Sequence, residues 1–177
     1  MKALTFHGVE NVAYETVPDP EMREPRDAIV RVDVAGLCGS DLHPYFGRET
    51  GIDPGTVLGH EFVGEVVEID SEAIRRIADA DHDVRFSTGD RVVAPFTTNC
   101  GNCFYCRAGL TARCERGQLF GWREGGRGLH GGQAQFVRVP LADATLVRVP
   151  PKLEDPGLAP LHSDPRWKAL LRRVKRK

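Results

Sequence analysis

The dominant pattern of the sequence is a series of short alternating segments separated by turn-forming residues. The chain has 19 glycines and 12 prolines among 177 residues, and this frequency favours short strands and turns over long helices. Residues 30–34 are typical, because three valines would share one face of a strand with Arg31 and Asp33 on the other. Similar segments are 2–6, 12–17, 62–69, 91–95, 133–139 and 145–149. Seven short strands predict a mainly β domain, built as a barrel or a sandwich.

Two segments have a helical period instead. Apolar residues at i, i+3 and i+4 predict about two helical turns over residues 72–79, on a surface insertion that runs from Ser71 to Val84. Near the end, Asp164 is placed to cap a short C-terminal helix that begins at Pro165. Its apolar stripe is Trp167, Leu170, Leu171 and Val174.

Length and charge exclude several classes of function. The chain is long enough for one domain with a core and short for two. Residues 151–177 have eight Lys/Arg and three Asp/Glu, a net +5, so the net charge of −1 leaves −6 for the rest. The basic tail has a single aromatic residue, Trp167, and no nucleic-acid reading motif, which argues against nucleic acid as a partner. No apolar run approaches the ~18 residues that span a bilayer, so we expect a cytoplasmic protein without membrane contact.

Four of the five cysteines have metal-ligand spacing. They follow C-x2-C-x2-C-x7-C at Cys100, Cys103, Cys106 and Cys114. Four thiolates complete a tetrahedral zinc shell with no open position, which is typical of a structural site. The alternatives are four unrelated free thiols or disulfides, but an odd number of cysteines in a reducing compartment does not favour a disulfide framework. We therefore expect a zinc-binding loop lobe at about residues 97–118.

A second, looser group combines CGSDLH at residues 38–43 with GHE at residues 59–61. Cys38 and His60 are ligand types of a catalytic zinc that keeps one position open for substrate, and Asp41 could orient the imidazole. The alternative is a buried cysteine and a packed histidine, and spacing alone does not decide between the two.

Several strings together resemble one known family. CGSDLH, PGTVLGHEFVGEVVEI, GDRVVAPF, the cysteine quartet and GGQAQFVRVP are similar to the N-terminal GroES-like domain of zinc-dependent medium-chain alcohol dehydrogenases. The resemblance covers residues 1 to about 164 and is closest to the formaldehyde-dehydrogenase-like and polyol-dehydrogenase-like branch. It implies a partly open GroES-like β-barrel and an enzyme that oxidises small alcohols or aldehydes with NAD(P).

The resemblance also implies metal ligands. Cys38 and His60 match ligands of the catalytic zinc, Glu61 matches an acidic neighbour that lies behind the metal and sometimes ligates it, and Asp41 matches the carboxylate that supports the histidine. Asp164 is the candidate for the third protein ligand, a role that competes with capping the C-terminal helix. The four cysteines of the quartet match the structural zinc lobe.

Ser40 and His43 match the family's proton relay. Ser40 would take the proton of the substrate hydroxyl, and His43 would pass it to solvent. The sequence then departs from the family after Asp164, where residues 165–177 form a divergent basic tail and no Rossmann domain follows. We therefore expect the chain alone to be inactive, with a missing nucleotide-binding domain or a second copy of the chain as its protein partner.

One glycine motif could be mistaken for a cofactor site. Gly126, Gly128 and Gly131 fit G-x-G-x-x-G, but a strand follows them instead of a helix. We interpret these glycines as a loop that leads into a strand, and we expect no cofactor-binding residues. The alternative to an enzyme is a non-catalytic zinc-stabilised binding or assembly module, and a zinc-knuckle nucleic-acid binder is less favoured because few cations accompany the aromatic residues of the lobe.

Overall fold

The computed structural model describes residues 1–77 and 86–150, and the fold is mainly β, as predicted. The strands are β1 (Lys2–Gly8), β2 (Asn11–Thr16), β3 (Ala28–Ala35), β4 (Thr56–Val57), β5 (Phe62–Ile69), β6 (Arg91–Ala94), β7 (Trp122–Glu124), β8 (Arg127–Leu129), β9 (Phe136–Val139) and β10 (Val147–Arg148). The helical turns are α1 (Leu42–Tyr45), α2 (Ser71–Ile77), α3 (Phe104–Arg107), α4 (Ala142–Thr145) and the 3₁₀ turns η1 (Gly39–Asp41) and η2 (Thr111–Arg113). The C-terminal helix and Asp164 lie outside the described residues.

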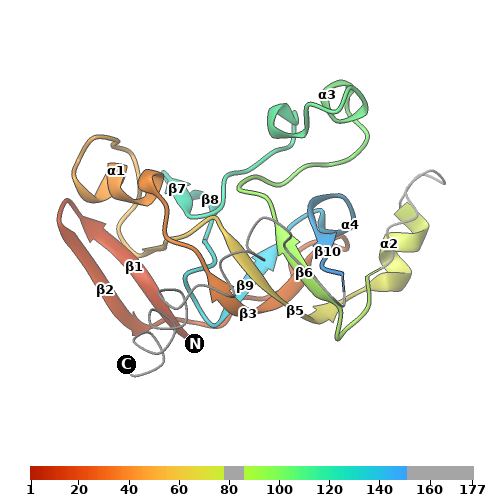
Figure 1. Ribbon diagram of the computed structural model, residues 1–177, viewed down its shortest axis with the longest axis horizontal. Helices are drawn as coiled ribbons and strands as arrows, with labels where there is room; N and C mark the ends of the chain where they lie inside the picture. Colours follow the sequence, from red (N-terminus) through yellow and green to blue (C-terminus); the bar gives the residue numbers. More distant parts are fainter. Residues whose placement is uncertain (78–85, 151–177) are drawn as a thin grey trace, which may run out of the picture.

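Two antiparallel sheets and a hairpin make up the fold (Figure 1). The larger sheet has the order β10-β6-β5-β3-β9, the smaller sheet has the order β2-β1-β4, and β7 pairs with β8. The sheets meet at a bridge between Ala3 and Ala134, where the Leu4 N–H donates to Gln133 O at 2.8 Å. Within the described part of the chain the strand pairing does not close into a barrel, so the structure is an open version of the one expected.

The main core lies against the five-stranded sheet. Val30, Val66, Val92 and Phe120 are at most 1% exposed, and the Phe62 and Phe120 rings pack edge to face with centroids 5.2 Å apart. Each such side chain contributes about 1.5–3 kcal/mol by leaving water. Alternating sequence therefore produced a buried face, as expected for a half-buried sheet.

The prediction for residues 30–34 was wrong at one position. Val34 is 60% exposed and does not share the buried face of Val30. The register of β3 against β5 shifts between Val32 and Val34, and such an irregularity rotates the following side chains away from the core.

Three strands were not predicted, and two of the predicted strands are shorter in the structure than expected. β4 has only two residues, and β7 and β8 form a hairpin inside the glycine cluster that we had interpreted as a loop. The strand expected over residues 133–139 begins at Phe136, and that over 145–149 is reduced to β10 because Thr145 ends α4. The Thr145 hydroxyl is buried and donates to the carbonyl groups of Pro140 and Asn99.

A helix was predicted over residues 72–79, and α2 confirms it as far as Ile77; residues 78–84 of the predicted insertion lie outside the described residues. The first turn of α2 is capped by Asp70, whose Oδ1 accepts the Ala73 N–H at 2.9 Å, and Ile74 is 6% exposed. No helix within the described residues has the length and apolar character needed to cross a membrane.

The cysteine segment projects from the sheets as a separate lobe around α3 (Figure 1). Its base is held by a bridge between Thr97 and Leu119 and by two bonds that join Thr98 to Gln118. The Thr98 N–H donates to Gln118 O at 2.9 Å, and the Gln118 N–H donates to the Thr98 hydroxyl at 3.0 Å. Backbone pairing therefore fixes where the lobe begins and ends.

Candidate metal centres and catalytic cleft

Strand pairing brings Cys38 and His60 together although 22 residues separate them. β3 and β5 are neighbours with Ala35 opposite Phe62, and the Gly36 N–H extends the ladder by donating to Glu61 O at 2.7 Å. Cys38 follows the end of β3 and His60 precedes the start of β5, so both side chains lie at the same end of the strand pair.

The two ring nitrogens of His60 face different partners. Nε2 lies 3.1 Å from the Cys38 Sγ, while Nδ1 lies 3.7 Å from Asp41 Oδ1. The other oxygen of Asp41 accepts the Cys38 N–H at 2.8 Å, so one buried carboxylate orients both residues. The carboxylate therefore faces the Nδ1 side of the imidazole, at a distance longer than a hydrogen bond.

Cys38, Asp41 and His60 form one group of potential metal ligands, with one ligand atom from each within 4.8 Å of the others. A sulfur and a nitrogen bound to one tetrahedral zinc would lie about 3.5 Å apart. The observed separation of 3.1 Å is close to this, so the two donors fit the ion after a small adjustment.

Ser40 is the nearest hydroxyl to this pair. Its Oγ lies 2.7 Å from the Cys38 Sγ and 3.1 Å from the His60 Nε2. A hydroxyl at this point can exchange a proton with any group bound between the sulfur and the imidazole.

These residues line a cleft of about 420 Å³, a volume suited to a small ligand. Its polar lining is Cys38, Ser40, Asp41, Glu49, His60 and Glu61. Its apolar lining includes Ile52, Leu58, Phe96, Leu119, Phe120 and Trp122. The apolar wall was not anticipated from the sequence, although Trp122, one of two tryptophans and placed in a glycine-rich segment, was an available signal.

Glu61 and His43 stand apart from the ligand group. The Glu61 side chain is exposed and packs over Gly36, where a Cβ would lie 2.5 Å from its Oε2. His43 pairs through Nδ1 with Glu49 Oε1 at 3.3 Å, and Glu49 lines the cleft although His43 does not. Glu49 had no distinguishing signal in the sequence.

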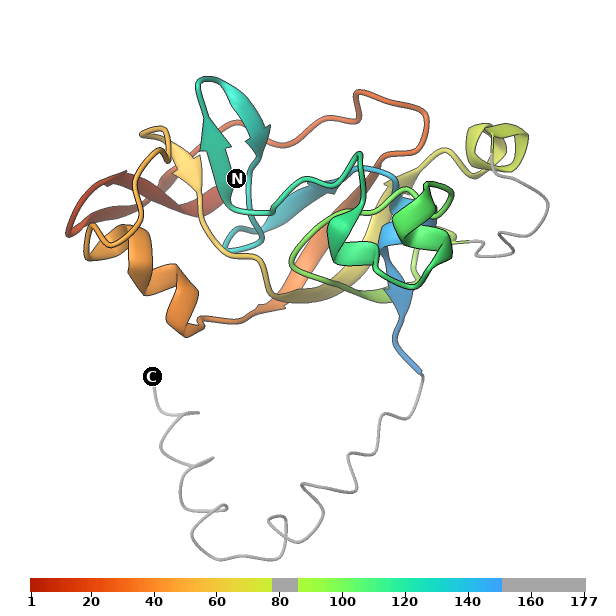
Figure 2. The same cartoon turned by 90° about the horizontal axis from the view of Figure 1, so that it is seen from above.

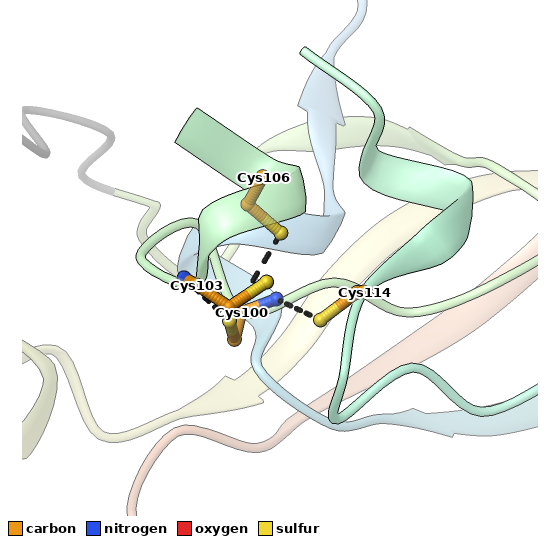
Figure 3. A group of neighbouring side chains, drawn as sticks. All are labelled: Cys100, Cys103, Cys106 and Cys114. Carbon is orange, nitrogen blue, oxygen red and sulfur yellow. Dashed lines mark hydrogen bonds between the residues drawn. The ribbon is translucent and has the colours of Figure 1, made fainter. Parts of the chain in front are cut away.

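The four cysteines of the lobe converge on one point (Figure 3). Their sulfur atoms all lie within 4.8 Å of one another, and those of Cys100 and Cys106 are 4.0 Å apart. Two sulfurs on a tetrahedral zinc would be separated by about 3.8 Å. The residues present therefore fit a four-thiolate metal site.

Backbone donors surround these sulfurs and support their ionised form. Burial opposes ionisation of the Cys100 thiol, but the N–H groups of Asn102 and Cys103 and the Arg116 side chain outweigh it and lower the pKa to about 6. Burial and the neighbouring Cys103 thiol raise the pKa of Cys106 to about 12. The four thiols thus differ in acidity, and a bound cation would be needed to ionise all of them together.

Comparison with known proteins places this geometry in context. The family model described as alcohol dehydrogenase GroES-like domain matches residues 24–151. Medium chain reductase/dehydrogenase ucsI of an Acremonium species is 46% identical over 89% of this chain and 49% of its own length. Zinc-type alcohol dehydrogenase B of Aspergillus flavus is 42% identical over 88% of this chain and 33% of its own.

A solved structure agrees with the sequence relatives. Alcohol dehydrogenase TADH from Thermus sp. ATN1 has a TM-score of 0.74 and 42% identity, over 87% of this chain and 41% of its own. The chain thus spans half or less of the length of the proteins it matches.

Proposed function

The chain belongs to the family of alcohol dehydrogenase GroES-like domains, and from that membership we propose that it is the zinc-binding catalytic domain of an enzyme that oxidises small alcohols or aldehydes with NAD(P). The observation that carries the proposal is the imidazole of His60, with Nε2 at 3.1 Å from the Cys38 sulfur and Nδ1 facing Asp41 in the lining of a small cleft.

The chain's own residues have defined tasks in this proposal. A zinc ion held by Cys38 and His60 would act as a Lewis acid toward the substrate oxygen. Asp41, which faces Nδ1 at 3.7 Å, would hold the imidazole proton on that nitrogen and leave the lone pair of Nε2 for the metal. Ser40, in contact with both donor atoms, would accept the hydroxyl proton of the substrate.

The proton would leave through His43. The His43 side chain is 43% exposed to solvent and pairs with Glu49. Glu49 lines the cleft, so this pair connects the cleft with solvent. Imidazole is suited to proton transfer near neutral pH. The apolar wall, including Phe96 and Trp122, would hold the carbon part of a small alcohol and exclude water from the reacting end.

We assign a structural role to the cysteine quartet. Four thiolates leave no open coordination position, and a lobe with few apolar side chains needs the metal for its order. In this proposal residues 1–164 form the catalytic domain, Asp164 supplies the third protein ligand of the catalytic zinc, and Glu61 stays near the metal without ligating it in the described arrangement.

Binding of the nicotinamide cofactor is proposed to need a nucleotide-binding domain besides this chain. All strand pairs within residues 1–77 and 86–150 are antiparallel, and the first two glycines of the motif lie on the β7–β8 hairpin. Dinucleotides bind where a parallel strand leads into a helix. Calorimetry with NAD and NADP should therefore give no heat of binding with the isolated chain, and stoichiometric binding would contradict this part of the proposal.

Metal titration tests the catalytic site directly. We expect the native chain to bind two Co²⁺ ions and Cys38→Ser to bind one. Asp41→Asn, which keeps the side-chain shape, should weaken the second ion about 10–100-fold. Glu61→Gln is the matched control and should change its affinity little, because that carboxylate lies outside the ligand group. Native stoichiometry of one would favour the zinc-stabilised binding module over the enzyme.

A further inference from the structure

A second cleft, of about 470 Å³, lies between the N-terminal segment of residues 17–23, the strand β4, the hairpin β7–β8 and the strand β9. In the view of Figure 2 the hairpin, drawn in teal, stands at the edge of the molecule opposite the orange helix α1. The volume is within the range of small-molecule sites, and no step of the proposed oxidation uses this cleft. The cationic and imidazole side chains that line it are Arg23, Arg123, Arg138 and His130.

One contact of the His130 ring on the cleft wall joins two hydrogen-bond donors without an acceptor between them. The Val57 N–H donates to the His130 Nδ1 at 3.0 Å, so Nδ1 carries no proton and the ring must hold its proton on Nε2. Nε2 lies 3.2 Å from Nη1 of Arg123, which is also only a donor. Two N–H donors therefore face each other on the cleft wall. An oxygen that accepted both hydrogen bonds would satisfy this pair.

The charge around these donors is positive. Arg138 donates through Nη1 to Asp27 at 2.7 Å, and the terminal ammonium of Met1 pairs with Asp19. Within the described residues no ion pair is formed by Arg123 or by the side chain of Arg23. Glu21 is the remaining acidic residue of the lining. Among the residues that the structure describes, these two guanidinium groups therefore have no carboxylate partner.

The carboxylate that contacts the glycine loop is already committed. Asp53 accepts the Gly125 N–H at 3.0 Å and the Gly126 N–H at 2.7 Å with its two oxygens. These amides therefore do not serve an external ligand, in contrast to the amides of a dinucleotide-binding loop. A ligand in the cleft would therefore be recognised by side chains and not by these backbone amides.

We propose that this cleft binds a small phosphorylated metabolite through its phosphate group. Guanidinium groups form strong paired hydrogen bonds with phosphate oxygens, and the His130 Nε2–H adds a further donor. The partly exposed apolar residues of the lining, including Val17, Pro20 and Phe136, contact the carbon part of the ligand. Burial in the cleft and the three guanidinium groups lower the pKa of His130 to about 4, which keeps the imidazole neutral and agrees with the proton on Nε2.

Binding is measured by NMR at the His130 imidazole nitrogens, during titration of the zinc-loaded chain with inorganic phosphate, glycerol 3-phosphate or acetate. We expect both phosphates to shift the Nε2 resonance, with glycerol 3-phosphate the tighter, and acetate to bind at least tenfold more weakly. The proposal is overturned if inorganic phosphate leaves the resonance unchanged. Acetate binding as tight as phosphate would refute the choice of a phosphate ligand.

Matched variants locate the site. Arg123→Gln should weaken phosphate at least tenfold, as expected for losing a charged hydrogen bond. Arg23→Gln tests the second guanidinium without disturbing the hairpin, and should weaken phosphate several-fold. Arg127→Gln, on the same hairpin and outside the lining, is the control and should bind as the native chain does. Equal effects of Arg127→Gln and both cleft variants would overturn the proposal.

A cysteine variant separates this site from the catalytic cleft. Cys38→Ser removes the proposed catalytic zinc, which could itself attract phosphate. The His130 response to phosphate should persist in this variant, and its loss would place the phosphate at the zinc and overturn the second site.

Discussion

Arg26 and Asp143 form a bidentate ion pair, with Nε to Oδ1 at 2.8 Å and Nη2 to Oδ2 at 2.6 Å, across 117 residues of sequence. The Asp143 side chain is 1% exposed and that of Arg26 is 12% exposed. The Nη2 group also donates to the carbonyl oxygen of Cys100 at 3.2 Å. One guanidinium thus connects the segment before β3, the helix α4 and the first cysteine of the lobe.

Asp143→Asn should destabilise the protein strongly. The substitution leaves the Arg26 charge buried without its partner, which typically costs about 3–5 kcal/mol. Urea unfolding at constant zinc would measure the loss in the free energy of unfolding. Glu65→Gln is the control, because the Arg31–Glu65 pair is exposed at 48% and 36% and should be worth at most about 1 kcal/mol. Equal losses in the free energy of unfolding for the two variants would show that the Arg26–Asp143 pair stabilises the fold no more than an exposed ion pair does.

Removal of zinc should open the lobe between Cys100 and Cys114 while its base stays ordered. The outer part of the lobe has Phe104 and Leu110 exposed at 73% and 49%, so little burial holds it without metal. The base keeps its two hydrogen bonds between Thr98 and Gln118. Limited proteolysis with and without a chelator would show new cuts only inside the lobe. An unchanged pattern after verified zinc loss would contradict a structural role for the metal.

The two metal sites should differ in retention. The quartet offers four thiolates, which complete the coordination shell of a zinc ion. At the cleft, the described residues offer one sulfur and one imidazole nitrogen in direct contact, those of Cys38 and His60. Mild chelation should leave well under two zinc ions per chain, with the survivor on the quartet. Metal analysis of Cys38→Ser and Cys103→Ser would check this. Retention of the tight zinc by Cys103→Ser and its loss from Cys38→Ser would reverse the assignment.

The imidazole of His130 should titrate near pH 4 in the folded chain. Its pKa lies below the ordinary value of 6.5 because of burial and then Arg123, so the unfolded chain binds a proton that the folded chain refuses. The free energy of unfolding should therefore fall as the pH decreases from about 6.5 to 4. In an NMR titration Arg123→Gln should raise the pKa, whereas the exposed Arg127→Gln should not. An unshifted pKa in Arg123→Gln would exclude the guanidinium as a cause.

Gly59→Ala should disturb the metal cleft more than another glycine substitution does. Gly59 has φ +92°, and an added Cβ would lie 2.5 Å from the Gln133 Cγ and 2.9 Å from its backbone N. Gly55, with φ +82° and nothing within 4 Å of its Cβ position, is the control, for which backbone strain of about 1–3 kcal/mol is expected alone. Thermal unfolding and metal content would be compared. Equal behaviour of the two variants would show that the Gln133 contact is unimportant.

The sequence determined the features that depend on neighbouring residues. The cysteine quartet occupies fifteen residues, so its spacing alone predicted that the sulfurs converge. The helix α2 and most strands followed from their periodicity. These features are local, because each is stabilised by interactions within a few residues of chain.

The tertiary structure decided everything that depends on strand register. It set Cys38 beside His60 through the pairing of β3 with β5, turned Val34 out to solvent at a register shift, and joined Arg26 to Asp143. It also formed the β7–β8 hairpin, whose glycines concealed the alternation that marks a strand. Register is the sum of many weak contacts between distant segments, and a one-residue slip reverses which side chains face the core. No short stretch of sequence contains that information.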